Sequence, residues 1–116
     1  EICNAGHVPP LVARGGAIER VAPTGLPIGM FCDERFSVSR VRLSPGDTIL
    51  LYTDGLNETL DRAGQEYGLD RLSGLLAGQS KNRPSDLLAS CLRDLETFRG
   101  GASPKDDLTL MAVRRS

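Results

Sequence analysis

The chain has 116 residues and a net charge of −1, with 40% hydrophobic and 25% charged residues. This length corresponds to about one small domain, and the composition is typical of a soluble globular protein. The low net charge argues against nucleic acid or an anionic membrane as a partner, and no apolar run reaches the roughly 18 residues that span a bilayer.

The first predicted elements are short strands. Ile2 and Cys3 have the character of the end of a strand, and the absence of a methionine before Glu1 suggests a fragment of a longer protein. Residues 11–13 and 18–21 flank a pair of glycines, which predicts a β-hairpin. The following segment, "PTGLPIGMF", combines prolines and glycines and is predicted to be irregular.

Two further strands are predicted before the middle of the chain. Residues 36–43 alternate apolar and polar side chains with one change of phase, which predicts a half-buried strand with a bulge near Ser39. A turn is predicted over residues 44–47. Residues 49–52 are apolar without alternation, which is typical of a strand covered on both faces. We therefore expect this strand at the centre of the sheet.

Two helices and a last strand complete the predicted fold. Leucines recur at helical spacing from residue 69, with Gly78 as a plausible stop, and a longer apolar stripe covers residues 87–98. Pro84 suits the first turn of that second helix, and Gly100 suits its end. Residues 108–113 are mostly apolar and predict a strand. The element order favours an α+β fold with antiparallel strands and two helices.

Asp54 is the first candidate for chemistry, because it directly follows the strand predicted at residues 49–52. A carboxylate held by a rigid element at an open edge suits a metal ligand, and Gly55 leaves space beside it for a solvated cation. Asp-Gly is also a common turn pair. A turn without chemistry therefore stays open as the alternative.

The second candidate is the adjacent pair Asp106 and Asp107, which precedes the last predicted strand. Neighbouring carboxylates repel each other unless a positive charge lies close by, and hard cations such as Mg²⁺ or Mn²⁺ prefer oxygen ligands of this kind. A solvated loop is the alternative. If the two strands are neighbours, Asp54 and Asp106 would converge on one site.

The remaining candidates are weaker. His7 could act as a general acid, although a turn histidine satisfied by the backbone is the better interpretation. Glu58 and Glu66 could assist through water, but a helix surface is the favoured place for both. The three cysteines are scattered without a CxxC pair and predict free thiols in a reducing cytosol, in keeping with a cytoplasmic protein. No phosphate-binding loop with a lysine, nucleophile elbow or HExxH motif occurs.

Five stretches taken in order resemble the bacterial PP2C-like (PPM) serine/threonine phosphatases of the SpoIIE/RsbU type. They are "NAGHVPP", "GLPIGMF", "PGDTILLYTDGLNE", "YGLDRL" and "DDLTLMAV". The resemblance covers essentially the whole chain and implies an αββα sandwich, of which this chain would be the C-terminal part. It implies a pair of Mn²⁺ or Mg²⁺ ions held by carboxylates, with Asp54 and Asp106 as ligands. Asp107 is a weaker candidate, and Gly55 would offer its backbone to the metal shell.

The same resemblance implies the substrate and the partners. Substrates of this family are typically phosphoserine or phosphothreonine on small STAS-type anti-sigma-factor antagonists, and an upstream sensor domain is expected in the parent chain. The family's further aspartate motif of the "GDfyD" kind, which bridges the two metals, is missing from this sequence. The fragment is therefore expected to be inactive by itself. A non-catalytic regulatory or binding module with the same fold remains the alternative.

A truncated sandwich is expected to expose apolar strand edges and faces, which promotes self-association. We therefore expect the 116-residue chain to form a homo-oligomer.

Overall fold

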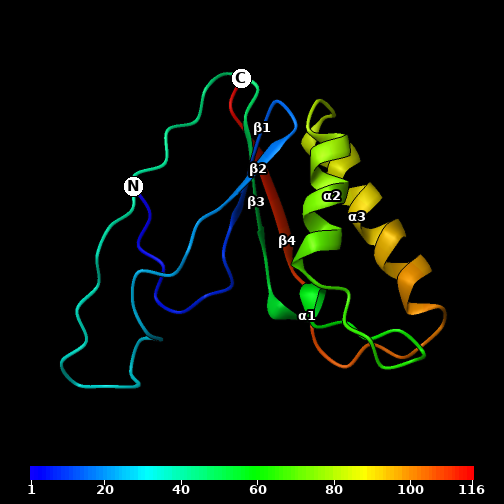
Figure 1. Cartoon of the computed structure of the whole chain (residues 1–116), viewed down its shortest axis with the longest axis horizontal. Helices are drawn as coiled ribbons and strands as arrows, with labels where there is room; N and C mark the ends of the chain where they lie inside the picture. Colours follow the sequence, from blue (N-terminus) through cyan, green and yellow to red (C-terminus); the bar gives the residue numbers. More distant parts are fainter.

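A computed structural model describes all 116 residues as a four-stranded antiparallel sheet with two long helices on one face (Figure 1). The strands are β1 (Leu11–Arg14), β2 (Ala17–Arg20), β3 (Thr48–Tyr52) and β4 (Leu110–Arg114), and their order in the sheet is β2-β1-β3-β4. The helices are α1 (Asp54–Asn57), α2 (Leu69–Gln79) and α3 (Pro84–Arg99). The predicted α+β fold with antiparallel strands is confirmed, and the one-turn helix α1 adds to the two predicted helices.

The hairpin of β1 and β2 forms around the glycine pair as predicted. Leu11 pairs with Arg20, and Arg14 pairs with Ala17. Gly15 and Gly16 both have positive φ angles, 54° and 96°. The tight turns that match the twist of paired strands need positive φ at both central positions, which glycine adopts without steric cost.

Both long helices begin and end close to the predicted residues. Pro84 is the first residue of α3, where its missing N–H would have no partner in any case. Gly100 ends the same helix in the left-handed conformation, and its N–H donates to the Glu96 carbonyl oxygen at 3.1 Å. Helix α2 continues one residue past Gly78, to Gln79.

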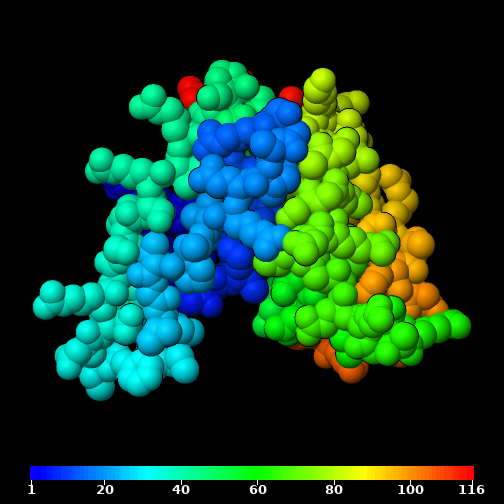
Figure 2. All heavy atoms as spheres, viewed as in Figure 1, coloured from blue at the N-terminus to red at the C-terminus, as the bar shows by residue number.

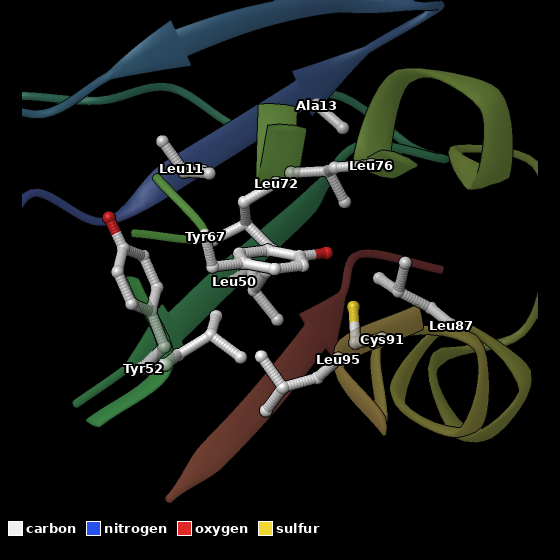
Figure 3. Packing of buried hydrophobic residues seen from close by; sticks show 11 residues of the cluster. Leu11, Ala13, Leu50, Tyr52, Tyr67, Leu72, Leu76, Leu87, Cys91 and Leu95 are labelled. Atoms are coloured by element: carbon white, nitrogen blue, oxygen red, sulfur yellow. The ribbon is translucent and has the colours of Figure 1, made fainter. Parts of the chain in front are cut away.

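The hydrophobic core lies between the sheet and the two long helices (Figure 3). Alternate residues of β1 and β3 point toward the helices, and leucines of α2 and α3 pack against them. Leu50 of β3 is completely buried at the middle of this layer. The eleven buried members are Leu11, Ala13, Leu50, Tyr52, Leu56, Tyr67, Leu72, Leu76, Leu87, Cys91 and Leu95.

Two predictions about strands are wrong. Residues 36–43 form no strand, because their only ladder contact is a single bridge between Ser39 and Ile2. Phe36 and Val38 are exposed rather than half-buried. Strand β3 is central, as expected, but it is not covered on both faces. Its residues alternate between buried and half-buried, with Ile49 and Leu51 on the less covered face.

Residues 1–10 and 22–44 contain only isolated bridges and extend to the side of the sheet away from the helices (Figure 1). Glycines at two positions allow these segments to pack closely against each other. A Cβ atom on Gly6 would lie 2.5 Å from Cδ of Pro27, and one on Gly25 would lie 2.5 Å from Cδ1 of Phe36. Gly6 of "NAGHVPP" and Gly25 of "GLPIGMF" therefore have a packing role.

Asp94 links α2 to α3 at the edge of the core. Its carboxylate accepts hydrogen bonds from the Tyr67 hydroxyl at 2.5 Å and from Nε and Nη2 of Arg71, both at 2.9 Å. The Arg71 guanidinium lies over two aromatic rings, 5.3 Å from the centroid of Tyr67 and 5.0 Å from that of Phe98. The hydrogen bonds from Arg71 hold the pKa of Asp94 below its usual value.

Replacing Asp94 with asparagine should lower the free energy of unfolding of the complete gene product by about 1–2 kcal/mol. This estimate lies toward and below the low end of the range for charged hydrogen bonds, because solvent reaches Arg71 and screens the pair. Urea denaturation of both proteins measures the difference. Glu96→Gln is the matched control, since Glu96 is an exposed partner of Arg99 on the same helix, and it should change stability by less than about 0.5 kcal/mol.

The contribution of Asp94 should also depend on pH. Its pKa is lower in the folded protein than in the unfolded chain, so its full stabilisation is present above the ordinary aspartate pKa of about 3.9. It is lost as the pH falls through the lower, folded-state value. A stability difference between wild type and Asp94→Asn that persists unchanged in strong acid would contradict this assignment.

Candidate metal centre

The end of β3 lies beside the start of β4. The sequence left open whether these two strands are neighbours. Tyr52 pairs with Leu110 at the last position of the ladder. The ladder continues one step further, because the Thr53 N–H donates to the Thr109 carbonyl at 3.1 Å and the Thr109 N–H donates to Thr53 Oγ1 at 3.0 Å. The segment that follows β3 and the segment that precedes β4 are thereby fixed to each other.

Asp54 is the first residue of α1, directly after this junction. The Glu58 N–H donates to the Asp54 carbonyl at 2.9 Å, and Oγ1 of Thr59 donates to the Gly55 carbonyl at 2.6 Å. Asp-Gly therefore begins a one-turn helix and is not a simple turn. Leu56 is completely buried in the core and anchors this helix.

Gly55 is the point of closest approach between α1 and the loop before β4. A Cβ atom at this position would lie 2.1 Å from the carbonyl oxygen of Asp107. No side chain can be accommodated at that distance, so glycine is required for the two segments to meet. The role of Gly55 visible here is close packing, and its predicted contact with a metal stays a prediction.

The carboxylates of Asp54, Asp106 and Asp107 are all exposed at this edge of the sheet. Asp54 lines a hollow of about 250 Å³ together with His7 and Thr53, and Asp106 lines a larger cavity of about 650 Å³ that begins at Gly55. Asp106 Oδ1 accepts a hydrogen bond from the Asp107 N–H at 2.7 Å. The carboxylates come from both sides of the β3–β4 junction.

The chemistry of these donors fits a hard divalent cation. Carboxylate oxygens on rigid elements, open to water, are what Mg²⁺ and Mn²⁺ prefer. The chain contains no group of three or more His, Cys, Asp or Glu side chains close enough to hold a metal ion together. Asp54 and Asp106 are therefore candidates for part of a ligand set rather than for all of it.

Two of the other sequence candidates border these hollows: His7 lies beside Asp54, and Glu58 lines the larger cavity with Asp106. His7 Nδ1 lies 2.9 Å from the Val8 carbonyl oxygen, and its backbone is held by Asn4, in keeping with the turn interpretation. Glu58 follows the end of α1, and Glu66 forms an isolated bridge with Leu60. The prediction that both glutamates lie on a helix surface is wrong.

All three cysteines are unpaired: Cys3 and Cys32 are exposed, and Cys91 is buried in the core. Burial raises the pKa of the Cys91 thiol to about 11, so it remains protonated near neutral pH.

Thr53 is the residue at this junction that the sequence interpretation missed. Besides its bond from the Thr109 N–H, Oγ1 lies 3.5 Å from the Asp107 carbonyl oxygen. Its hydroxyl thus touches the loop that carries Asp106 and Asp107. The available signal was its place between the buried strand and Asp54, where a hydroxyl residue commonly begins a helix.

The sequence matches the family described as Stage II sporulation protein E (SpoIIE) over residues 1–116, which is the whole chain. The chain belongs to the SpoIIE family. Protein IcfG of Synechocystis sp. (strain PCC 6803) is a relative of this SpoIIE-family chain, 27% identical over 97% of the chain and 18% of the length of IcfG.

Solved structures agree with this family assignment. The PP2C domain of SiaA from Pseudomonas aeruginosa matches with a TM-score of 0.82 and 21% identity, over 95% of this chain and 44% of that one. The phosphatase domain of SpoIIE from Bacillus subtilis matches with a TM-score of 0.74 and 24% identity, over 95% and 47%. The RsbU and RsbW domains of a Mycobacterium tuberculosis protein match with 0.69 and 31%, over 98% and 32%.

This SpoIIE-family chain therefore has the fold of part of a PP2C phosphatase domain, and it spans less than half the length of each of these proteins. None of its three helices has the length and apolar character that crossing a membrane requires.

Proposed function

We propose that the protein containing this chain is a metal-dependent serine/threonine phosphatase. The observation that carries the proposal is the pairing of β3 with β4, which brings the segments of Asp54 and Asp106 to one edge of the sheet in a member of the SpoIIE family. The substrate we propose is a phosphoserine or phosphothreonine on a STAS-type anti-sigma-factor antagonist, with activity set by a sensor domain of the parent chain.

In this proposal Asp54 and Asp106 hold Mn²⁺ or Mg²⁺, two ions in the intact domain, with ligands from outside this chain. Cations bound there would neutralise the phosphate charge and lower the pKa of a bound water that attacks phosphorus. The residues of this chain would position the ligands. The hydrogen bond to Thr53 and the close contact at Gly55 hold the segments of Asp54 and Asp106 against each other, so the carboxylates would need little reorganisation when a cation binds.

Removing divalent metal should abolish the activity of the complete gene product. We expect phosphate release from a phosphothreonine peptide to stop after treatment with EDTA and to return when Mn²⁺ is added in excess, because the nucleophilic water depends on the metal. The measurement is free phosphate over time. Hydrolysis that continues undiminished in EDTA would contradict the metal-dependent mechanism. If no hydrolysis occurs with any divalent metal, the alternative of a non-catalytic module is favoured.

We also propose that the 116-residue chain alone self-associates through the sheet face away from the helices. Met111 and Val113 are exposed there, at 52% and 44%, beside the half-buried Ile49 and Leu51. An apolar face of this kind promotes association in water. Light scattering should give a mass above that of one chain, and a clean monomer at high concentration would refute this proposal.

A further inference from the structure

A cavity of about 650 Å³ extends from Asp106 along the lower end of the helices. One wall is the segment that follows α1, and the other is the loop between α3 and β4. Only two of its twelve lining residues are hydrophobic. Five of the twelve are ionisable, and a cavity with charged groups along its walls suits a charged segment of a polypeptide better than a purely apolar ligand.

The first wall is a small, well-braced hairpin. The Tyr67 N–H donates to the Thr59 carbonyl at 2.8 Å, and Leu60 and Glu66 form a bridge. Asp61 Oδ1 accepts from the N–H groups of Ala63 and Gln65, at 2.8 and 2.9 Å. The Asp61 carboxylate is thus engaged by backbone, and Arg62 is held at the tip of the hairpin.

Arg62 reaches across to the end of α3. A Cβ atom on Gly101 would lie 3.0 Å from Nη2 of Arg62, and one on Gly100 would lie 3.7 Å from its Nε. The two glycines leave room for the guanidinium group. The spheres of residues near 60 accordingly lie against those near 100 at the lower right of Figure 2.

Two cations in this cavity have no acidic partner within the chain. The ion pairs of the protein involve neither Arg62 nor Lys105, which lines the second wall next to Asp106. The lining also holds three carboxylates, those of Glu58, Asp61 and Asp106, and none of them forms an ion pair with Arg62 or Lys105. Asp61 Oδ1 instead accepts its two hydrogen bonds from backbone N–H groups within the hairpin.

We propose that this cavity binds acidic residues next to the phosphorylated residue of a protein substrate, with Arg62 and Lys105 as specificity-determining residues. The inference rests on the proposed phosphatase function and names the substrate class of that same site. A peptide whose phosphate lies beside Asp106 would run its neighbouring residues through the cavity. Both cations are exposed, so they would add selectivity and association rate more than affinity.

The test compares two phosphothreonine peptides that differ only in acidic or basic residues beside the phosphothreonine. The complete gene product with Mn²⁺ should give the higher kcat/KM for the acidic peptide, and this preference should weaken as salt is added. In the double variant Arg62→Ala/Lys105→Ala the ratio of the two kcat/KM values should fall by about tenfold. Both side chains are exposed, and circular dichroism checks that the variant folds.

The matched control is Lys81→Ala/Arg83→Ala, which removes the same two charges at the far end of the helix pair (Figure 1). It should keep the wild-type ratio. Equal kcat/KM values for the two peptides in wild type, or an unchanged ratio in Arg62→Ala/Lys105→Ala, would overturn the inference and leave the phosphatase function standing. Failure of the wild type to hydrolyse either peptide would overturn the proposed function, and the inference with it.

Discussion

Replacing Asp54 with asparagine in the complete gene product should lower Mn²⁺-dependent phosphate release by at least about 100-fold, because loss of a direct ligand costs more than the roughly 10–100-fold loss typical of its hydrogen-bond partners. Asparagine keeps the shape of the side chain and its place at the start of α1, but it removes the negative charge that a divalent cation needs. We expect Asp106→Asn to have the same effect and Asp107→Asn a smaller one. Steady-state kinetics with a phosphothreonine peptide at saturating Mn²⁺ measure the loss.

The control for this prediction is Asp33→Asn, which makes the same chemical change at an exposed position in residues 22–44. It should retain wild-type turnover. If Asp54→Asn also turns over at the wild-type rate, Asp54 is no ligand, and the Asp-Gly pair at the end of β3 is only the start of a one-turn helix.

Replacing Gly55 with alanine should disrupt both the fold and the activity. The new methyl group would lie 2.1 Å from the Asp107 carbonyl oxygen and 3.0 Å from its carbonyl carbon, so backbone has to move. Overpacking of this kind typically costs about 1–3 kcal/mol of unfolding free energy. The displaced loop carries Asp106 and Asp107, so phosphate release should fall as well. Urea denaturation and the phosphatase assay measure the two effects.

Gly74→Ala is the matched control for the glycine change. Gly74 lies within α2, and a Cβ atom there meets nothing within 4 Å. Alanine in a helix interior should raise stability by up to about 1 kcal/mol and leave activity unchanged. Equal stability of Gly55→Ala and wild type would show that the contact with Asp107 is looser than the structure indicates.

The elements with a strong local signal were predictable from the sequence. The glycine pair gave the β1–β2 hairpin, and Pro84 and Gly100 bounded α3, because turns and helix ends depend on residues close together in the chain. The strand predicted at residues 36–43 was wrong for the complementary reason. The alternation of apolar and polar side chains is only part of what makes a strand, because a strand must also pair with a neighbouring backbone segment. Residues 36–43 have only one such pairing, the bridge between Ser39 and Ile2.

The sequence identified which residues could form the candidate site, but not how they are arranged in space. Asp54 follows one apolar run and Asp106 precedes another, and both features are visible in the sequence. The register in which Tyr52 pairs with Leu110 joins segments more than 50 residues apart, and no local pattern determines it. The bracing by Thr53 and the position of Arg62 over Gly101 depend on that long-range packing, so they appeared only in the structure.

The most direct test of the account is the position of Mn²⁺ in crystals of the complete gene product. We expect an anomalous scattering peak within about 2–2.5 Å of carboxylate oxygens of both Asp54 and Asp106, the range for hard cations with oxygen ligands. Manganese bound elsewhere, or a peak that neither carboxylate contacts, would contradict the claim that the β3–β4 junction carries part of a metal-dependent phosphatase site.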